Sequence, residues 1–367
     1  MAFASAFASV PLLDTKVYLW GSRYGSDTVL QHTARHAEGK MTLLESGKFT
    51  REAFDVNHQA SPAPDLLVSI TCKRDLLIKG GALDYLLTDT NTTLLCVVHH
   101  SDKWIDRTSV HFRLAGAWMR RNRIKFITLS PHVTEALKAH QVLSRYTIET
   151  FVPTFVPPPF CKPPAEDAKL LSRGHTFISL QGNFQAKRRN YNATFQGFQQ
   201  FHDMYDTDDK YRLVVLGNGE SLDVPVKLQD KVLLRPDLNY AEYYGILSHS
   251  MVILPAFAND AYVETTASST VAVASIVGVP LMADERLVDA YSYLDEDEVY
   301  MRSKDETEMQ ALSRIVKMPA SHHNSVAAQM KAKREILAMV NSQLVQTWAD
   351  ESIELKQEGI QASLHYK

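Results

Sequence analysis

The sequence predicts an α/β protein of two doubly wound, Rossmann-like domains, each built on a parallel sheet. Short apolar runs alternate with helical patterns along the chain, which is typical of right-handed βαβ units. Six of the fifteen prolines fall within residues 151–164, where they interrupt this alternation. Proline removes backbone donors and fixes φ, so this stretch is expected to be an extended hinge. A length of 367 residues fits two such domains.

The first half, residues 1–150, contains four apolar runs that we expect to be buried strands. They are residues 17–20, 66–71, 94–98 and 126–129. Each run is short, bounded by polar or turn residues, and apolar on both faces. These features predict one parallel sheet on the amino-terminal side of the hinge.

The second half repeats the pattern over residues 165–325. Its expected strands are residues 176–180, 212–216, 232–234, 251–254 and 280–282. Its expected helices are residues 191–205, 240–248, 269–277 and 306–315. Residues 326–367 are predicted to add one or two amphipathic helices. Ligands of such domains bind beyond the carboxyl ends of the strands, so a shared cleft between the halves is expected.

The composition and charge of the chain argue against some classes of function. Apolar residues make up 45% and charged residues 22%, which is ordinary for a globular protein. The net charge of -3 argues against a dedicated nucleic-acid binder. Residues 1–160 hold 18 basic and 14 acidic side chains, so this part favours an anionic partner. No apolar run is long enough to span a bilayer and the start is a poor signal peptide, so we expect a cytoplasmic protein.

The three cysteines, Cys72, Cys96 and Cys161, are too few and too unevenly placed for a disulfide framework. Cys72 and Cys96 sit inside apolar runs and are expected to be small core residues. None of the spacings suits zinc, and no metal site is predicted.

A basic turn follows the first strand of the second half. Gly182 and Asn183 come directly after the strand, and the triplet Lys187, Arg188 and Arg189 precedes the next helix. Glycine lets a backbone approach a ligand closely, and cations beside a helix N-terminus suit a phosphate or pyrophosphate. The alternative is a solvated basic turn.

Two further strand ends add candidate contacts. One strand ends in Gly217-Asn218, which taken alone is an ordinary turn signal. The loop after residue 254 carries Glu264 and then the hydroxyl residues Ser268, Ser269 and Thr270, just before an apolar helix. Hydroxyl residues are favoured as N-caps, and the free N–H groups there form an anion site. The alternative is a plain helix cap.

The first half offers His99 and His100, at the end of a predicted strand. An imidazole facing the cleft has a suitable pKa for contacting a substrate or developing charge. The alternative is one packed and one solvated histidine. Ser130 is expected to cap the helix that follows the strand at residues 126–129. Gly21 and Gly25 are expected to form a loop that faces, across the cleft, the phosphate expected at the basic turn.

The segment from Trp104 to Lys125 interleaves arginines with aromatic residues. A basic amphipathic helix of this kind can lie on an anionic membrane surface. The alternative is a helix that packs its aromatic residues inward.

Taken in order, these motifs resemble the donor-binding domain of GT-B glycosyltransferases, in particular the retaining enzymes of glycosyl transferase group 1, or family 4. The resemblance covers residues 176–302, and more loosely the whole chain. It implies that Gly182 and the basic triplet hold the diphosphate of a nucleotide-sugar donor. It also implies a catalytic histidine at His100 or His99, no cofactor and no metal. The acceptor (a glycan, a lipid-linked molecule or a small molecule) stays open.

One departure from the family concerns its two glutamates seven residues apart. Glu264 can replace the first, whereas Val273 occupies the place of the second. Either the hydroxyls at positions 268–270 supply the missing contacts, or activity is altered. The sequence therefore leaves open two alternatives, namely a catalytically weak relative acting as a binding subunit and a sugar-nucleotide epimerase.

Overall fold

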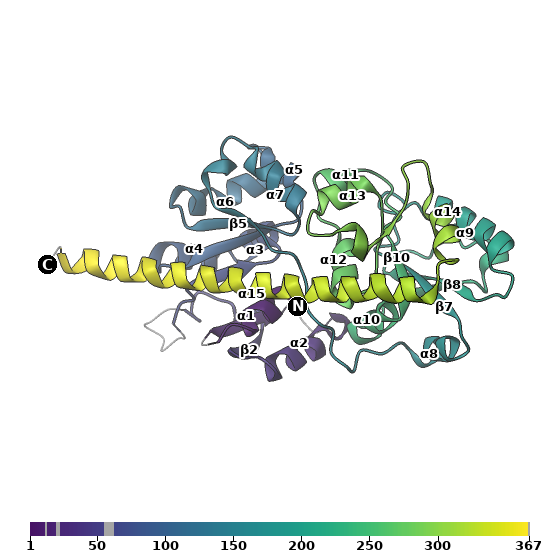
Figure 1. The fold of residues 1–367 in the computed structure, drawn as a ribbon. Coiled ribbons are helices and arrows are strands. Elements are labelled where there is room, and N and C mark those ends of the chain that lie inside the picture. The colour runs from purple at the N-terminus through teal and green to yellow at the C-terminus, as the bar shows by residue number, and fades with distance from the viewer. Residues whose placement is uncertain (12, 20–22, 55–61, 366–367) are drawn as a thin grey trace.

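The computed structural model describes residues 1–11, 13–19, 23–54 and 62–365, with side chains placed up to residue 354 (Figure 1). Its architecture confirms the prediction of two α/β halves with parallel sheets. In the first half β1 (Asp14–Leu19) pairs with β2 (Lys40–Glu45). A second sheet has the order β3-β4-β5-β6, formed by Leu66–Ser69, Thr93–Val98, Ile124–Thr128 and Ile148–Thr150.

The second half is built on a four-stranded parallel sheet in the order β10-β7-β8-β9. These strands are Ser250–Leu254, Thr176–Gln181, Tyr211–Gly217 and Val232–Pro236. A short parallel pair, β11 (Met282–Ala283) and β12 (Tyr300–Met301), lies beyond them. Since every strand is parallel to its neighbour, all carboxyl ends within a sheet lie at one edge, where ligands bind in open α/β sheets.

Helices connect the strands in both halves. In the first half they are α1 (Ala2–Ala8), α2 (Ser26–Arg35), α3 (Cys72–Ile78), α4 (Gly80–Asp89), α5 (Ser101–Ile105), α6 (Val110–Arg120) and α7 (Pro131–Lys138). In the second half they are α8 (Ala165–Ser172), α9 (Tyr191–Tyr205), α10 (Tyr240–Ser248), α11 (Ala261–Glu264), α12 (Ser269–Val277), α13 (Glu285–Ala290) and α14 (Glu308–Ile315).

The hinge, residues 151–164, contains no helix or strand. It is nonetheless anchored in both cores, since Phe151 packs with the first half and Phe155 with the second. The last described element is a single helix, α15 (Ala320–His365), where one or two helices were expected (Figure 1). Its Met330 packs in the second half, whereas its Trp348 packs in the first. One rigid element therefore joins the two halves.

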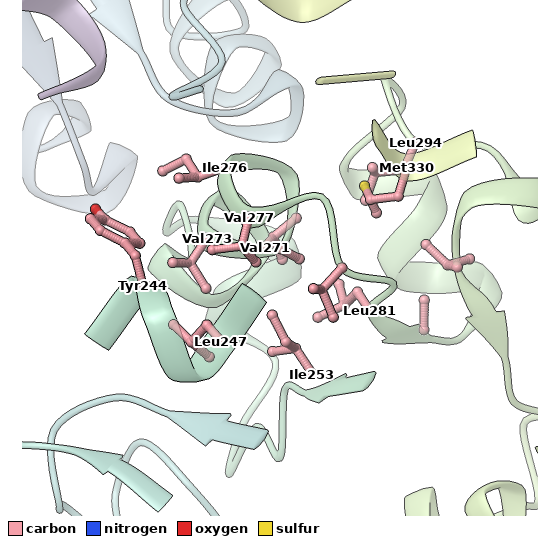
Figure 2. Packing of buried hydrophobic residues seen from close by; sticks show 14 of the residues in the cluster. Tyr244, Leu247, Ile253, Val271, Val273, Ile276, Val277, Leu281, Leu294 and Met330 are labelled. Atoms are coloured by element: carbon pink, nitrogen blue, oxygen red, sulfur yellow. The ribbon is translucent and has the colours of Figure 1, made fainter. Parts of the chain in front are cut away.

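The core of the second half surrounds α12, which is apolar on most sides. Figure 2 shows Val271, Val273 and Val277 packed with Ile253 of β10 and Leu247 of α10. Val271 and Ile253 are fully buried. A helix this apolar is stable only when enclosed, so its position relative to the sheet is fixed by packing.

The prediction that the cysteines form no disulfide is wrong for one pair. Cys72 and Cys96 are disulfide-bonded in the structure, and Cys161 is free. Cys96 lies on β4, and Cys72 begins α3 just after the neighbouring strand β3. Adjacent parallel strands thus bring the two Cα atoms to 5.3 Å, within the range a disulfide requires.

The basic segment from Trp104 to Lys125 forms α5, α6 and β5. Trp104, Trp118 and Met119 are buried in the core of the first half, as the packed-helix alternative predicts. A membrane contact by this segment stays a prediction, and it would have to use other side chains. In the part of the chain that the structure describes, no helix is long and apolar enough to cross a bilayer.

Candidate functional site

The carboxyl ends of β7 and β8 approach each other closely through two glycines. Gly182 N donates to the Leu216 carbonyl at 3.0 Å, and Gly182 has a φ of +144°. A Cβ placed on Gly217 would lie 1.8 Å from the Gly182 carbonyl oxygen. Gly217 is therefore required by contact between the two strands.

Two loops that are far apart in sequence run side by side at this edge. The loop after β7 forms an isolated bridge with the loop after β10, between Arg189 and Phe257. Asn190 N donates to the Ala256 carbonyl at 2.9 Å. This backbone pairing turns the Arg189 side chain toward the sheet, while Lys187 and Arg188 remain exposed.

Arg189 is a buried cation with only uncharged acceptors among the described residues. Only 3% of the surface of Arg189 is exposed to solvent. Nη2 donates to Thr270 Oγ1 at 2.6 Å, and Nε donates to the Gln181 carbonyl at 3.2 Å. The rings of Phe257 and Tyr262 lie 5.1 Å from its guanidinium carbon. Burial lowers the pKa of Arg189. No carboxylate of the described chain lies within ion-pair distance of it, although the charge of the partly buried Glu308 acts on it from farther away and acts to raise its pKa.

The N-terminus of α12 meets this arginine through a chain of polar side chains. Ser268 is the N-cap, and its Oγ accepts from Thr270 N at 3.1 Å. Gln181 Nε2 donates to Thr270 Oγ1 at 2.8 Å and to Ser269 Oγ at 3.3 Å. Tyr243 donates its hydroxyl to Gln181 Oε1 at 3.1 Å. Of the three hydroxyl residues, only Ser269 is exposed.

The first half reaches this site through the end of β4. His100 Nδ1 lies 3.0 Å from Thr266 Oγ1, and Ala267 N donates to the His99 carbonyl at 3.1 Å. Burial is the main cause of a lowered pKa of His100, and the charge of Arg188 lowers it further. His100 and the basic turn of the other half are thus electrostatic neighbours.

His132 is a contact between the halves that the sequence did not single out. Its Nδ1 lies 3.0 Å from the Ala290 carbonyl and its Nε2 lies 3.3 Å from the Thr266 carbonyl. The neighbouring Ser130 stands at the N-cap of α7, but its hydroxyl makes no capping bond, contrary to expectation. The available signal was the position of His132 just after a strand, next to a proline.

Tyr24 of the first half makes a further set of contacts with the second half. Its hydroxyl donates to Asp237 Oδ1 at 3.1 Å, and Asn218 Nδ2 lies 3.5 Å from the same hydroxyl. Gly25, at the start of α2, has a φ of +66°. Gly21, the other glycine of the predicted loop, lies outside the described residues.

Two other sequence candidates, Glu264 and Asn183, and the position of the absent glutamate lie apart from the Arg189 network. Glu264 is exposed and 3.9 Å from Arg286 of α13. Asn183 contributes its carbonyl, which accepts from the Tyr191 hydroxyl at 3.1 Å. Val273, at the place of the absent second glutamate, is buried in the apolar core.

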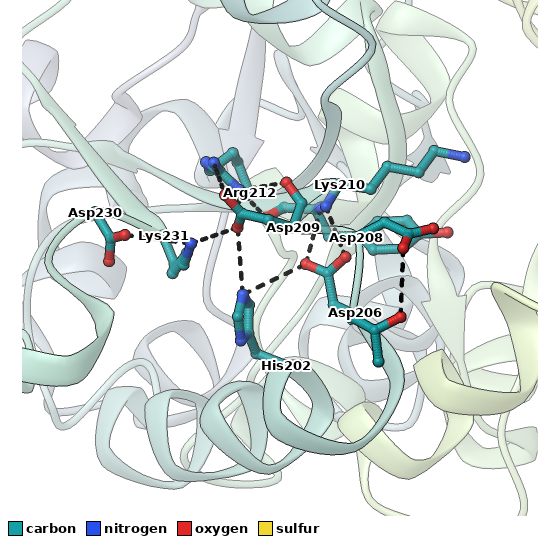
Figure 3. A network of polar contacts seen from close by, with 10 residues as sticks. His202, Asp206, Asp208, Asp209, Lys210, Arg212, Asp230 and Lys231 are labelled. Atoms are coloured by element: carbon teal, nitrogen blue, oxygen red, sulfur yellow. Dashed lines mark hydrogen bonds and ion pairs between the residues drawn. The ribbon is translucent and has the colours of Figure 1, made fainter.

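The opposite, amino-terminal edge of the same sheet carries a second charged cluster (Figure 3). Among the described residues, His202, Asp206 and Asp209 form the one group with the composition of a metal site. However, Asp209 is paired with Arg212 at 2.9 Å and with Lys231. These cations occupy the acceptor positions that a metal ion would need.

A cavity of about 790 Å³ lies on the outer side of the loop after β10. It is lined by residues of α9, α13 and α14. None of the candidate residues from the sequence lines it, but Phe257, whose ring lies over the Arg189 guanidinium, is among its lining residues.

Comparison with solved structures identifies the fold. Anabaena HepE, solved with UDP and glucose, superposes with a TM-score of 0.55 at 12% identity, covering 91% of both chains. A UDP-forming α,α-trehalose-phosphate synthase from Burkholderia xenovorans gives 0.50 at 10% identity, covering 92% of this chain and 98% of that one. Sucrose-phosphate synthase from Thermosynechococcus elongatus gives 0.50 at 13%, covering 86% and 77%.

These structures share the GT-B architecture, and the chain therefore has the GT-B fold, as its motif order predicted. No protein-family model matches the sequence, and the search of curated proteins finds no match. With identities of 10–13%, the likeness establishes the fold, and the chemistry must be argued from the site.

Proposed function

We propose that the protein is a glycosyltransferase that moves a sugar from a nucleoside-diphosphate sugar to an acceptor. The observation that carries this proposal is Arg189, a buried cation without a carboxylate partner beside the N-terminus of α12. A buried charge is costly unless it is paired, so a diphosphate is the natural partner for this position. HepE, which has a similar fold, was solved with UDP, and this supports a nucleoside diphosphate as the class of ligand.

In the proposed reaction, Arg189 and the α12 N-terminus neutralise the leaving diphosphate as the bond to the sugar breaks. Preorganised donors aimed at developing charge lower the barrier to the chemical step. Lys187 and Arg188 are exposed beside this position and would add charge from the solvent side. Retention of configuration and independence from metal ions follow from the family resemblance and form part of the proposal.

His100 is the proposed contribution of the first half. Burial keeps the pKa of the His100 imidazole below the usual value, which favours the neutral form of the ring. A neutral imidazole can accept or donate a hydrogen bond at the donor sugar. Ser269, the exposed hydroxyl at the α12 N-terminus, is the proposed replacement for the missing second glutamate. Glu264 keeps its proposed role at the donor sugar.

Binding and turnover of a donor test this proposal. We expect UDP or GDP to raise the melting temperature of the full chain, because a ligand of the folded state stabilises it by mass action. UDP-glucose or GDP-mannose should then be consumed slowly in water and faster with an acceptor. If neither diphosphate binds at millimolar concentration, the proposal fails.

Replacing His100 by Ala separates chemistry from binding. We expect turnover to fall by at least tenfold while UDP affinity changes little, because the imidazole acts on the sugar. The control is His140→Ala, because His140 lies in the turn after α7 and is not part of the proposed site. Full turnover in the His100 variant would remove its catalytic role.

A second candidate function is a binding subunit without turnover. The observation that favours it is Val273, an apolar core residue where the family has a glutamate. This candidate predicts that UDP binds and that no donor is consumed with any acceptor.

A further inference from the structure

The cavity of about 790 Å³ on the outer side of the loop after β10 takes no part in the proposed reaction. Its walls come from three segments that are far apart in sequence, namely α9, this loop, and the stretch from β11 to α14. Gly197 of α9 permits close packing of two of these walls, because a Cβ there would lie 2.8 Å from Met309 Cγ of α14. The cavity is therefore bounded by packed elements, and its volume suits a small molecule.

The loop after β10 separates the cavity from the basic turn at residues 187–189. Ala258 N donates to the Arg188 carbonyl at 3.2 Å, and Asn259 Nδ2 donates to the Lys187 carbonyl at 2.9 Å. Ala258 and Asn259 also line the cavity, whereas the basic triplet does not. The cavity and the proposed donor site thus lie on two faces of one loop, so one can be occupied while the other is.

The two arginines in the cavity wall are paired within the fold. Arg286 Nη1 lies 3.1 Å from Asp260 Oδ1, and Arg302 forms an ion pair with Asp284. All four of these side chains line the cavity, so their charges cancel there. An anionic ligand would find no unpaired cation among the described residues of this wall.

Glu308 is the remaining charged side chain in the wall, and it forms no ion pair with any residue that the structure describes. Its Oε1 accepts from Ala256 N at 2.8 Å. Burial raises the pKa of Glu308, although the bond from Ala256 and the charges of Arg302 and Arg189 counteract this effect in part. A carboxyl group accepts hydrogen bonds, so this wall favours a ligand that donates them.

Two glutamines of α9 face the same cavity. Gln196 and Gln200 are one helical turn apart and exposed, and both line it. Each amide offers two donors and a carbonyl acceptor, which matches hydroxyl groups that also donate and accept. Met204 and Tyr205, at the end of the same helix, add exposed apolar surface. This combination suits a sugar, whose ring carries hydroxyls at its rim and C–H groups on its faces.

We infer that this cavity binds a neutral sugar unit, with Gln196, Gln200 and Glu308 contacting its hydroxyl groups. The inference goes beyond the proposed function, because the sugar site is separate from the donor site and does not depend on it. A neutral sugar fits better than an anionic one, since the arginines are paired and the Glu308 carboxylate would repel a negative charge.

Ligand-observed NMR titration of the full chain tests this inference, with glucose, mannose, galactose, maltose and cellobiose as probes and with UDP present. We expect at least one of these sugars to bind at millimolar concentration. The double variant Gln196→Ala with Gln200→Ala should weaken its binding roughly tenfold, because two hydrogen bonds are lost. Gln199→Ala is the matched control, since Gln199 lies on the same helix and does not line the cavity. A melting temperature like that of wild type confirms that each variant folds.

Four results would overturn the inference. One is that no sugar of the panel binds, and another is that the double variant binds the sugar as wild type does. A third is that glucuronate or glucosamine, added to the panel, binds better than every neutral sugar. The fourth is that sugar binds only when UDP is left out, which would assign it to the donor site. If UDP itself fails to bind, the proposed function fails, and the same titration without UDP still decides on the cavity.

Discussion

A buried arginine lies at each edge of the four-stranded sheet of the second half, and the two arginines have different partners. At the amino-terminal edge, Arg212 Nη1 and Nη2 each donate to Asp209 at 2.9 Å (Figure 3). At the carboxyl edge, Arg189 is equally buried and meets only hydroxyl and carbonyl oxygens among the described residues. One arginine forms an ion pair within the fold, whereas the other has hydrogen bonds to uncharged oxygens and, among the described carboxylates, only a longer-range interaction with the partly buried Glu308.

The difference between the partners of these two arginines indicates which edge of a doubly wound sheet suits a ligand. Asp209 is paired with Arg212 and Lys231, and the backbone N atoms of Lys210 and Tyr211 donate to Asp206. Such a network stabilises the folded chain. The carboxyl edge instead combines an unpaired cation with strand ends that only glycine permits, which suits a site awaiting an anion.

The largest loss of stability is expected for a substitution at the carboxyl edge of the sheet. Gly217→Ala should destabilise the protein by about 3 kcal/mol, because the new Cβ collides with the Gly182 carbonyl and backbone must move. Urea unfolding measures this loss. The matched control is Gly81→Ala in α4, where an added Cβ meets nothing within 4 Å. Equal stabilities for the two variants would show that the strand ends are not held by this contact.

A smaller effect is expected at the amino-terminal edge. Arg212→Met should cost about 1 kcal/mol, because Asp209 is partly exposed and keeps Lys231 as a partner. Its UDP affinity should equal that of wild type. An altered UDP affinity in this variant would contradict the claim that UDP binding depends on the carboxyl edge and not on the amino-terminal edge.

The smallest effect is a pH dependence. Hydrogen bonds from Arg212, then from Lys231 and His202, hold the pKa of Asp209 well below its usual value. Its stabilising contribution is therefore complete above the unfolded carboxyl pKa of about 3.9 and is lost as pH falls below it. Asp209→Asn should show a shallower loss of stability between pH 5 and pH 3 in urea titrations. An unchanged slope would contradict the pairing in Figure 3.

Sequence patterns predicted the strongly periodic elements well. The bounds of α9, α10 and α12 agree with the predicted ranges, because apolar periodicity and caps mark them locally. Strands β2, β6 and β12 were missed. β6 and β12 are very short, and the exposed ends of β2 weaken its apolar pattern.

The sequence predicted which segments form the candidate site, but it did not predict the contacts of their side chains. The triplet at positions 187–189 was identified, but its sequence is uniformly basic, so only the pairing with the distant loop at Phe257 shows that Arg189 turns inward. The partners of Gln181 lie on α12 and those of His132 lie in the other half, so the local sequence does not specify these contacts. The Cys72–Cys96 disulfide likewise depends on which strands are neighbours.

The most direct test compares UDP binding to wild type, Arg189→Met and Arg212→Met by calorimetry. If Arg189 is held for a diphosphate, its loss removes about 2 kcal/mol of charge-assisted bonding and weakens UDP roughly 30-fold. Without UDP the same variant should be at least as stable as wild type, because a buried unpaired charge is gone. UDP affinity like that of wild type in Arg189→Met, or UDP weakened equally by Arg212→Met, would contradict this role.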